Sequence, residues 1–262
     1  MIKALIFDFD GLIMDTESPE VDGWKGIYAE YGLEFPLQVW IHEVVGSTAA
    51  AFDPAAYLAA RLGRNLDLPT LHNRAHLYRL EKLSKSSALP GVIDYMKAAR
   101  RLDLQLAVAS NSGHAWVEGY LRQLGLLEDF EAIICREDVR HIKPDPDSFL
   151  TVLDVLKLRA DETLVFEDSP NGVQAARLAG MRVVAVPNPI TAHATIEGAN
   201  RVLACLTDLP LDVLLQQLEL DIRQEIPGDI SGIRLVEEQA FERPNEADLV
   251  DLCREHGKVS LS

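Results

Sequence analysis

The stretch Lys3-Ala-Leu-Ile-Phe-Asp-Phe-Asp10 decides the fold of this 262-residue chain. An apolar run over residues 4–7 leads into carboxylates at positions 8 and 10, which is the pattern of a buried strand that ends in acidic residues. Similar short apolar runs recur at 104–110, 132–135, 163–168 and 182–186. Amphipathic helical patterns fit between them, at about 92–101, 114–124, 146–157 and 170–179. Strands that alternate with helices predict an α/β fold built on a Rossmann-like parallel sheet.

One segment interrupts this alternation. From about Ser18 to Ser84 there is no clear strand, and helical patterns such as Val21–Tyr31 and Tyr57–Leu62 fill it. A turn at Leu89-Pro90-Gly91 marks the return to the alternating part. We therefore expect a core of residues 1–15 and 88–218, an inserted helical cap of residues 16–87, and a C-terminal extension of residues 219–262.

The composition limits the partners. The formal charge is −16, from 41 acidic and 25 basic residues, so the surface repels nucleic acid and anionic membranes. The same field repels phosphorylated metabolites, so binding one requires a local cation. Cys135, Cys205 and Cys253 form no CxxC pair, which favours reduced thiols over a disulfide or zinc site. The first apolar run is too short for a signal peptide or a membrane span, which predicts a cytoplasmic protein.

The first candidate site is Asp8-Phe-Asp10-Gly11. If the strand continues, both carboxylates project to the same side, where they could share a hard cation. One could attack phosphorus while the other handles protons. Gly11 would let the chain turn sharply after the strand. The alternative is a strand end with acidic turn residues.

Three further sites follow the later strands. Ser110-Asn111 could hold a phosphoryl oxygen or cap a helix. Lys143 precedes Pro144 and could point into the cleft as a fixed positive charge, or it could be a solvated surface lysine. Glu167-Asp168 could ligate a metal, which would explain two acids directly after an apolar strand, or Asp168 or Ser169 could cap the next helix. Ligands bind at the carboxyl ends of parallel strands, so the joint pattern predicts one phosphoryl-transfer site.

These motifs together resemble those of the haloacid dehalogenase-like hydrolases, most closely the branch that contains β-phosphoglucomutase and sugar phosphatases. DFDGLIMDTE at 8–17, Ser110-Asn111, Lys143-Pro144 and EDSPNG at 167–172 resemble the family's four motifs in order. The helical insert lies where the family carries its cap. The resemblance covers about residues 1–215.

The resemblance implies a role for each motif position. Asp8 would be the nucleophile that forms an aspartyl-phosphate, and Asp10 the acid/base. Mg²⁺ would be held by the Asp8 carboxylate, the Asp10 backbone carbonyl and Asp168, with support from Glu167. Catalysis would also use Ser110 and Lys143, which with Asn111 and Gly11 would bind the transferring phosphoryl group. Dehalogenase members lack the second aspartate, so Asp10 favours phosphate chemistry.

The cap motif departs from that of the mutases. The loop Val45-Gly-Ser-Thr-Ala49 continues into Ala50 and Ala51, where the mutases carry an arginine that grips a second phosphate. We therefore favour hydrolysis of a small phosphomonoester, such as a sugar phosphate, over a phosphosugar mutase activity. An arginine elsewhere in the cap could substitute, and the candidates are Arg61, Arg74 and Arg79.

Two further hypotheses concern the whole chain. Residues 233–262 are similar to the opening of a GCN5-related N-acetyltransferase domain, but the glycine-rich loop that would bind acetyl-CoA is missing, so we expect no such activity. A phospho-accepting receiver module is the rival from another class, and a silent binding protein is a second. The late acidic pair and the helical insert oppose the receiver module, and the full set of catalytic residue types gives no support to a silent protein.

Overall fold

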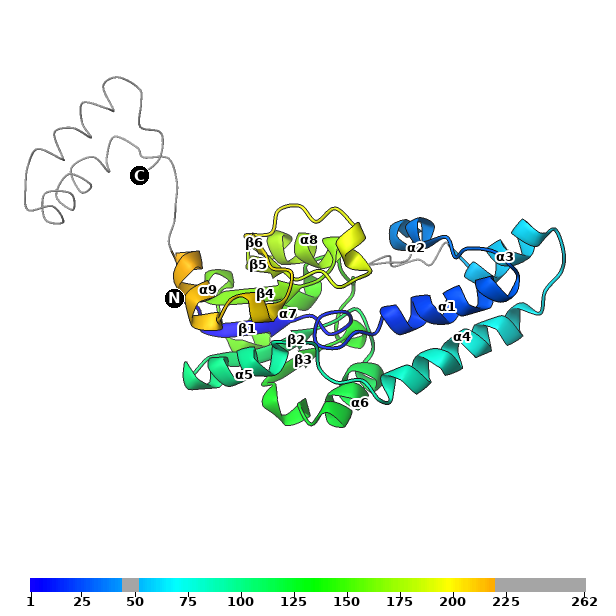
Figure 1. The fold of residues 1–262 in the computed structure, drawn as a ribbon. Helices are drawn as coiled ribbons and strands as arrows, with labels where there is room; N and C mark the ends of the chain where they lie inside the picture. Colours follow the sequence, from blue (N-terminus) through cyan, green and yellow to red (C-terminus); the bar gives the residue numbers. More distant parts are fainter. Residues whose placement is uncertain (44–51, 220–262) are drawn as a thin grey trace, which may run out of the picture. The chain divides into compact units, whose positions relative to one another are not determined.

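A parallel sheet lies among the helices α5 to α9 (Figure 1). The computed structural model describes residues 1–43 and 52–219. Within these residues six parallel strands form one sheet in the order β3-β2-β1-β4-β5-β6. Their bounds are β1 Ala4–Phe7, β2 Gln105–Ala109, β3 Ala132–Ile134, β4 Thr163–Glu167, β5 Arg182–Ala185 and β6 Arg201–Val202. The predicted α/β fold and its first five strands are confirmed. The sequence did not indicate β6, because it is two exposed residues without an apolar run.

Helices cover both faces of the sheet, as in a doubly wound fold. The helices that alternate with the strands are α5 Val92–Arg101, α6 His114–Leu124, α7 Asp147–Leu156, α8 Pro170–Leu178 and α9 Leu211–Glu219. On one face, α7 and α8 pack on alternate residues of the strands, such as Ile6, Val165 and Val183. On the other face, Tyr95 of α5 packs edge-on against Phe166 of β4. Both faces are therefore buried, which explains why the strands are continuous apolar runs.

A helical cap is inserted between β1 and β2 and gathers beyond the carboxyl end of β1 (Figure 1). Its described helices are α1 Ser18–Glu30, α2 Leu37–Glu43, α3 Pro54–Leu62 and α4 Leu68–Leu83. Asp53 and Asp67 begin α3 and α4, since each carboxylate accepts a hydrogen bond from backbone N–H groups of the first turn. The cap has its own buried cluster, in which aromatic rings from α1, the α1–α2 connection and α2 contact one another.

Several expectations fall on other parts of the chain. The loop at 45–51, Cys253 and the segment similar to an acetyltransferase opening lie outside the described residues. Cys135 is buried, Cys205 is half-buried, and both are free thiols.

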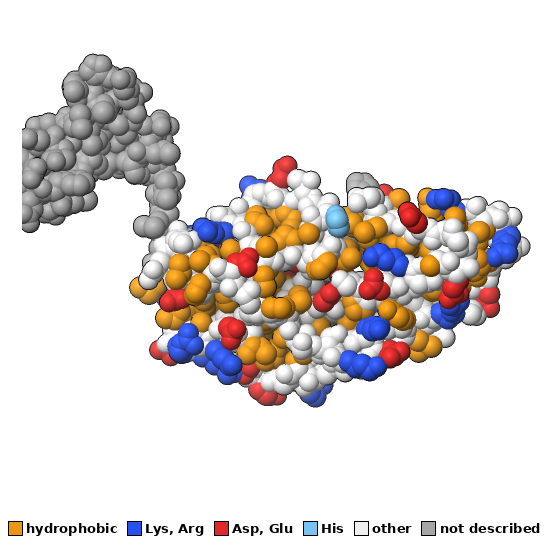
Figure 2. Space-filling view, viewed as in Figure 1, with side chains coloured by type: hydrophobic (Ala, Val, Ile, Leu, Met, Phe, Trp, Pro, Cys, Tyr) orange, Lys and Arg blue, Asp and Glu red, His pale blue; other side chains and the backbone are white. Residues whose placement is uncertain are grey.

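Acidic and basic side chains are interspersed on the face shown in Figure 2. Among the described helices, none is both long and apolar enough to span a bilayer.

Candidate active site

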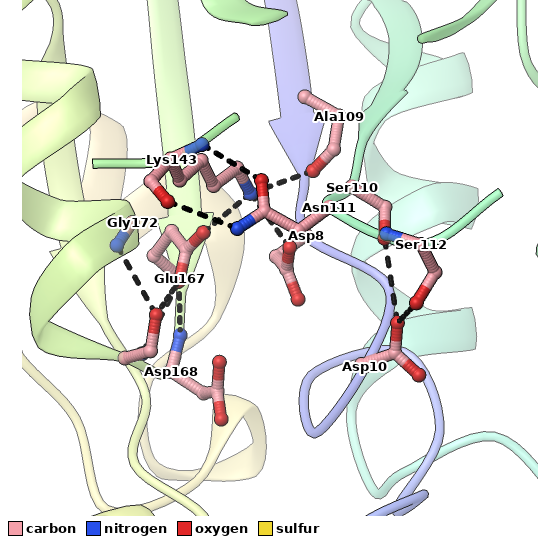
Figure 3. Close-up of polar contacts among 11 residues, drawn as sticks. Asp8, Asp10, Ala109, Ser110, Asn111, Ser112, Lys143, Glu167, Asp168 and Gly172 are labelled. Atoms are coloured by element: carbon pink, nitrogen blue, oxygen red, sulfur yellow. Dashed lines mark hydrogen bonds and ion pairs between the residues drawn. The ribbon is translucent and has the colours of Figure 1, made fainter. Parts of the chain in front are cut away.

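The predicted site residues meet where the strand order reverses direction, at the carboxyl edge of the sheet. β1 is flanked by β2 on one side and β4 on the other. Asp8 follows β1, and its backbone N–H extends the ladder by donating to Phe166 O at 3.0 Å. Ser110 follows β2, and Glu167 and Asp168 lie at the end of β4. The ladder therefore brings three motifs together at one edge (Figure 3).

Lys143 reaches into this edge from the loop before α7 (Figure 3). Its Nζ donates to Asp8 Oδ1 at 2.6 Å, to Glu167 Oε1 at 2.5 Å and to the carbonyl of Ala109 at 2.7 Å. The lysine is only 2% exposed, so the surface alternative is wrong. Burial lowers its pKa, but the charges of Asp8 and Glu167 outweigh burial and leave the pKa raised. Lys143 is therefore a permanent buried cation.

Asn111 holds the Lys143 backbone in place. Its Oδ1 accepts from Lys143 N at 2.8 Å, and its Nδ2 donates to Lys143 O at 3.1 Å. The resemblance suggested a role for the Asn111 backbone at the phosphoryl group. The side chain has this additional role, which the sequence did not indicate because the partners lie 32 residues apart.

Asp8, Glu167 and Asp168 form a buried acidic cluster in which one carboxylate oxygen of each residue lies within 4.8 Å of the others. Burial raises the pKa of Asp8 and of Asp168 well above the usual range, and neighbouring carboxylates raise both further. The Lys143 charge opposes this shift but does not cancel it. An all-oxygen, anionic donor set fits a hard divalent cation such as Mg²⁺. The Asp10 carboxylate is not part of this cluster.

Glu167 and Asp168 are held in different ways. Glu167 Oε2 accepts from the backbone N–H groups of Asp168 at 3.0 Å and Ser169 at 3.2 Å. Gly172 makes room for this, since a Cβ there would overlap the Glu167 carboxylate. Ser169 caps α8 by accepting from Gly172 N at 3.1 Å. Because Ser169 fills that role, the Asp168 carboxylate remains available at the cavity.

Asn188 and Gly11 lie close to Asp168. Asn188 Nδ2 donates to Asp168 Oδ2 at 2.7 Å and to Glu17 Oε2 at 3.1 Å. Gly11 has φ +80°, and a Cβ there would overlap both Asn188 and Asp168. Gly11 thus makes the expected turn, but it is not among the residues that line the cavity. Asn188 was not predicted, because it acts through contacts with residues more than 150 positions earlier.

Asp10 points away from Lys143 and towards the end of β2 (Figure 3). The strand does not continue to Asp10, because β1 ends at Phe7 and Asp10 forms only an isolated bridge with Met14, yet Asp8 and Asp10 line the same cavity. Each carboxylate oxygen of Asp10 accepts two hydrogen bonds. Oδ1 accepts from Thr16 Oγ1 at 2.8 Å and Trp116 Nε1 at 2.9 Å; Oδ2 accepts from Ser112 Oγ at 2.6 Å and Ser110 Oγ at 3.3 Å. Of these donors, only Ser110 was singled out from the sequence.

The cluster lies in a cavity of about 220 Å³ lined by both the core and the cap. The cap side contributes Glu17, Glu20, Trp40 and Arg79. Of the three arginines proposed as substitutes in the cap, Arg79 alone lines this cavity. Arg74 instead pairs with Glu30, and Arg61 lies over the ring of Tyr57.

The sheet is Rossmann-like and carries an inserted cap. Where its strand order reverses direction, Lys143 bridges two members of an acidic cluster. These features define a class of hydrolase. The family model for haloacid dehalogenase-like hydrolases matches residues 5–186. The chain belongs to this family, and the predicted assignment is confirmed.

Relatives within the family place the chain among its phosphatases. It is 41% identical over 218 residues to YhcW of Bacillus subtilis (strain 168), which is provisionally named a phosphatase; the match covers 83% of this chain and 98% of YhcW. It is 32% identical to the fructose-1-phosphate phosphatase YqaB of Escherichia coli (strain K12), over 70% of this chain and 95% of YqaB. It is 28% identical to the β-phosphoglucomutase of Bacillus subtilis, over 86% of this chain and all of that enzyme. The expected class, a phosphoric monoester hydrolase related to sugar phosphatases and β-phosphoglucomutase, is confirmed.

A solved structure shares both the fold and the cap. CbbY from Rhodobacter sphaeroides, crystallised as a variant in complex with xylulose-(1,5)bisphosphate, superposes with a TM-score of 0.60 at 25% identity. The match covers 80% of this chain and 96% of CbbY.

Proposed function

We propose that this protein is a Mg²⁺-dependent phosphatase of a small phosphomonoester, such as a sugar phosphate, and that it acts through an aspartyl-phosphate on Asp8. The observation that carries the proposal is the buried Lys143, which bridges Asp8 and Glu167 with Asp168 beside them. Such an arrangement neutralises charge at one fixed point, which is what phosphoryl transfer demands.

The first half of the reaction is attack by an Asp8 carboxylate oxygen on phosphorus. A bond forms between that oxygen and phosphorus while the bond from phosphorus to the leaving oxygen breaks, and Asp10 gives that oxygen a proton. In the second half, water attacks the phosphorus of the aspartyl-phosphate, Asp10 accepts the proton of the water, and Asp8 is released with inorganic phosphate. To donate, Asp10 must exchange one of its four hydrogen bonds for the substrate oxygen.

The remaining residues hold the phosphoryl group and the cation. Ser110, the Asn111 backbone and Lys143 bind the phosphoryl oxygens. Asp8, Glu167 and Asp168, with the Asp10 carbonyl, would hold Mg²⁺, which when bound supplies positive charge to the phosphoryl oxygens. Lys143 also holds Asp8 at 2.6 Å, which fixes the direction of the attacking carboxylate.

The division of the chain follows the same proposal. We assign residues 1–15 and 88–218 to the core that carries the chemistry and residues 16–87 to the cap that contacts the rest of the substrate. Residues 219–262 are assigned to a C-terminal extension.

A phosphosugar mutase is the second candidate, supported by the likeness to β-phosphoglucomutase. Hydrolysis is favoured, because an arginine in the cap loop is replaced by alanines and Arg79 is already paired with Glu20.

The test is phosphate release from a panel of phosphomonoesters, with Mg²⁺ and with EDTA. We expect Mg²⁺-dependent release that falls by at least about 10⁴-fold in Asp8→Asn. Asp154→Asn, a change at an exposed carboxylate of α7, is the matched control and retains full activity. Efficient interconversion of a sugar 1-phosphate and 6-phosphate would instead establish the mutase, and a stable phosphoprotein without turnover would establish the signalling module.

A further inference from the structure

We propose that Arg79 and Glu20 form a subsite on the cap that selects substrates with one phosphate and an uncharged, hydroxyl-bearing leaving group. The inference rests on the proposed phosphatase function and specifies its substrate class. Arg79 lies on α4, and its side chain lines the cavity that contains Asp8 and Lys143.

The position of Arg79 is fixed by Trp116. The guanidinium carbon lies 4.5 Å from the centre of the Trp116 ring, which is a cation–π contact. The indole Nε1 of the same tryptophan donates to Asp10 at 2.9 Å. In the proposed reaction Asp10 protonates the leaving oxygen. Trp116 therefore connects Arg79 to the Asp10 carboxylate. This places Arg79 on the side of the cavity to which the leaving group departs.

Arg79 also has unused hydrogen-bonding capacity. Its Nη1 pairs with Glu20 Oε2 at 2.7 Å, and its Nε is buried with no hydrogen-bond partner among the described residues. A buried N–H without a partner is costly, and a ligand oxygen would remove that cost. Glu20 and the nearby Glu17 line the same cavity and can accept from hydroxyl groups. The pair therefore offers both donors and acceptors to a polyol.

The charge of the cavity argues against a second phosphate. Two cationic side chains line it, Lys143 and Arg79. The acidic side chains that line it are more numerous, and they are Asp8, Asp10, Glu17, Glu20, Glu167 and Asp168. Lys143 and a bound divalent cation would face the reacting phosphoryl group, and Arg79 is already paired with Glu20, so among the described residues that line the cavity no cation is left for a second phosphate. Hydroxyl groups fit such a surface, whereas a second phosphate would be repelled. This distinguishes the chain from CbbY, which was crystallised with a bisphosphate.

The experiment compares kcat/KM for three probes: a hexose monophosphate, the matching hexose bisphosphate, and ethyl phosphate. Ethyl phosphate needs the same proton from Asp10 but offers no hydroxyl groups to the cap. We expect the wild type to prefer the monophosphate over the bisphosphate. Arg79→Gln should lower kcat/KM about 30-fold for the hexose monophosphate and less than about 3-fold for ethyl phosphate, since only the first loses charged hydrogen bonds. Glu20→Gln should raise the relative rate with the bisphosphate about 10-fold, because it removes one negative charge and frees Arg79.

Arg74→Gln is the matched control, since Arg74 lies on the same helix and pairs with the exposed Glu30 outside the cavity. It should change no kinetic constant. Equal losses for ethyl phosphate and the hexose monophosphate in Arg79→Gln would assign Arg79 a purely structural role and overturn the inference. A wild type that prefers the bisphosphate would also overturn it. If either of these outcomes occurs and the wild type still hydrolyses ethyl phosphate, the proposed phosphatase function stands. A wild type that is inactive on all three probes would refute the inference and the proposed function together.

Discussion

The sheet edge and the helical cap contribute side chains to the same cavity by different means. At the sheet edge, Asp8, Glu167 and Asp168 follow strands whose ladder fixes their positions, and Lys143 is buried among them. In the cap, Glu20 and Arg79 extend from the packed helices α1 and α4, and each is partly exposed.

The difference indicates a division of labour. The edge holds its carboxylates and Lys143 in one fixed arrangement, which suits chemistry that is the same for every phosphomonoester. In the cap, Glu20 and Arg79 are held by their ion pair and by the contact of Arg79 with the Trp116 ring of α6, so their substitution changes what binds without disturbing the sheet. The predictions below test this division, from the largest expected effect to the smallest.

Removing the buried cation Lys143 from the sheet edge should have the largest effect on activity. Lys143→Met should lower kcat by about 10³-fold, because the phosphoryl group and Asp8 both lose their charge partner. The measurement is the initial rate at saturating substrate and Mg²⁺. Lys157→Met, at an exposed position, is the control and should behave as wild type. A loss below about 10-fold would show that the edge does not depend on this cation.

Glu17 should make stability depend on pH. Burial raises its pKa to about 7 from an ordinary value near 4.5, although the hydrogen bond from Asn188 opposes the shift. The folded state therefore binds more protons than the unfolded state, so stability falls as pH rises from about 4.5 to 7 and then levels off. Glu17→Gln cannot ionise and should gain about 3 kcal/mol relative to wild type across that window.

The measurement for Glu17 is urea unfolding in EDTA at several pH values. Glu34→Gln, in the connection between α1 and α2, is the control and should show no such pH-dependent difference. A constant difference between Glu17→Gln and wild type at all pH values would contradict the raised pKa.

Trp116 lies between the two regions, and its replacement should show that they are coupled. Trp116→Phe keeps an aromatic ring for Arg79 but removes the hydrogen bond to Asp10. We expect kcat to fall about 10-fold with little change in KM, because the acid/base is less well oriented while binding is retained. Tyr120→Phe, on the same helix, is the control. A change in KM alone would mean that Trp116 acts in binding and not in positioning.

The cap core should affect stability without affecting chemistry. Tyr28 is buried, and its hydroxyl donates to Pro54 O at 2.6 Å. Tyr28→Phe should lower the free energy of unfolding by about 1 kcal/mol and leave kcat unchanged. Thermal unfolding and steady-state kinetics on one preparation give both values. A fall in kcat at full stability would contradict the division between cap and edge.

The sequence predicted the sheet edge well, because the parallel ladder places the ends of apolar strands side by side. It could not choose between Asp168 and Ser169 as the cap of α8, because both types are good caps and only the geometry assigns Ser169. Trp116 and Asn188 escaped prediction, because side-chain direction decides their contacts, some of which join residues more than 100 positions apart, such as Trp116 with Asp10 and Asn188 with Gly11. Arg79 was one of three candidates, and the orientation of α4 distinguishes it from Arg74 on the same helix.

The strand order also has a consequence for biosynthesis. β1 leaves the ribosome before the other described strands, yet its register with β4 joins residues about 160 positions apart. At ordinary translation rates that interval takes roughly 10 to 30 seconds. During it, α1 to α4 are complete and can pack on one another, while Glu167 and Asp168 are not yet beside Asp8. If Asp8 is the nucleophile, as proposed, we expect activity to arise only when β4 joins the sheet.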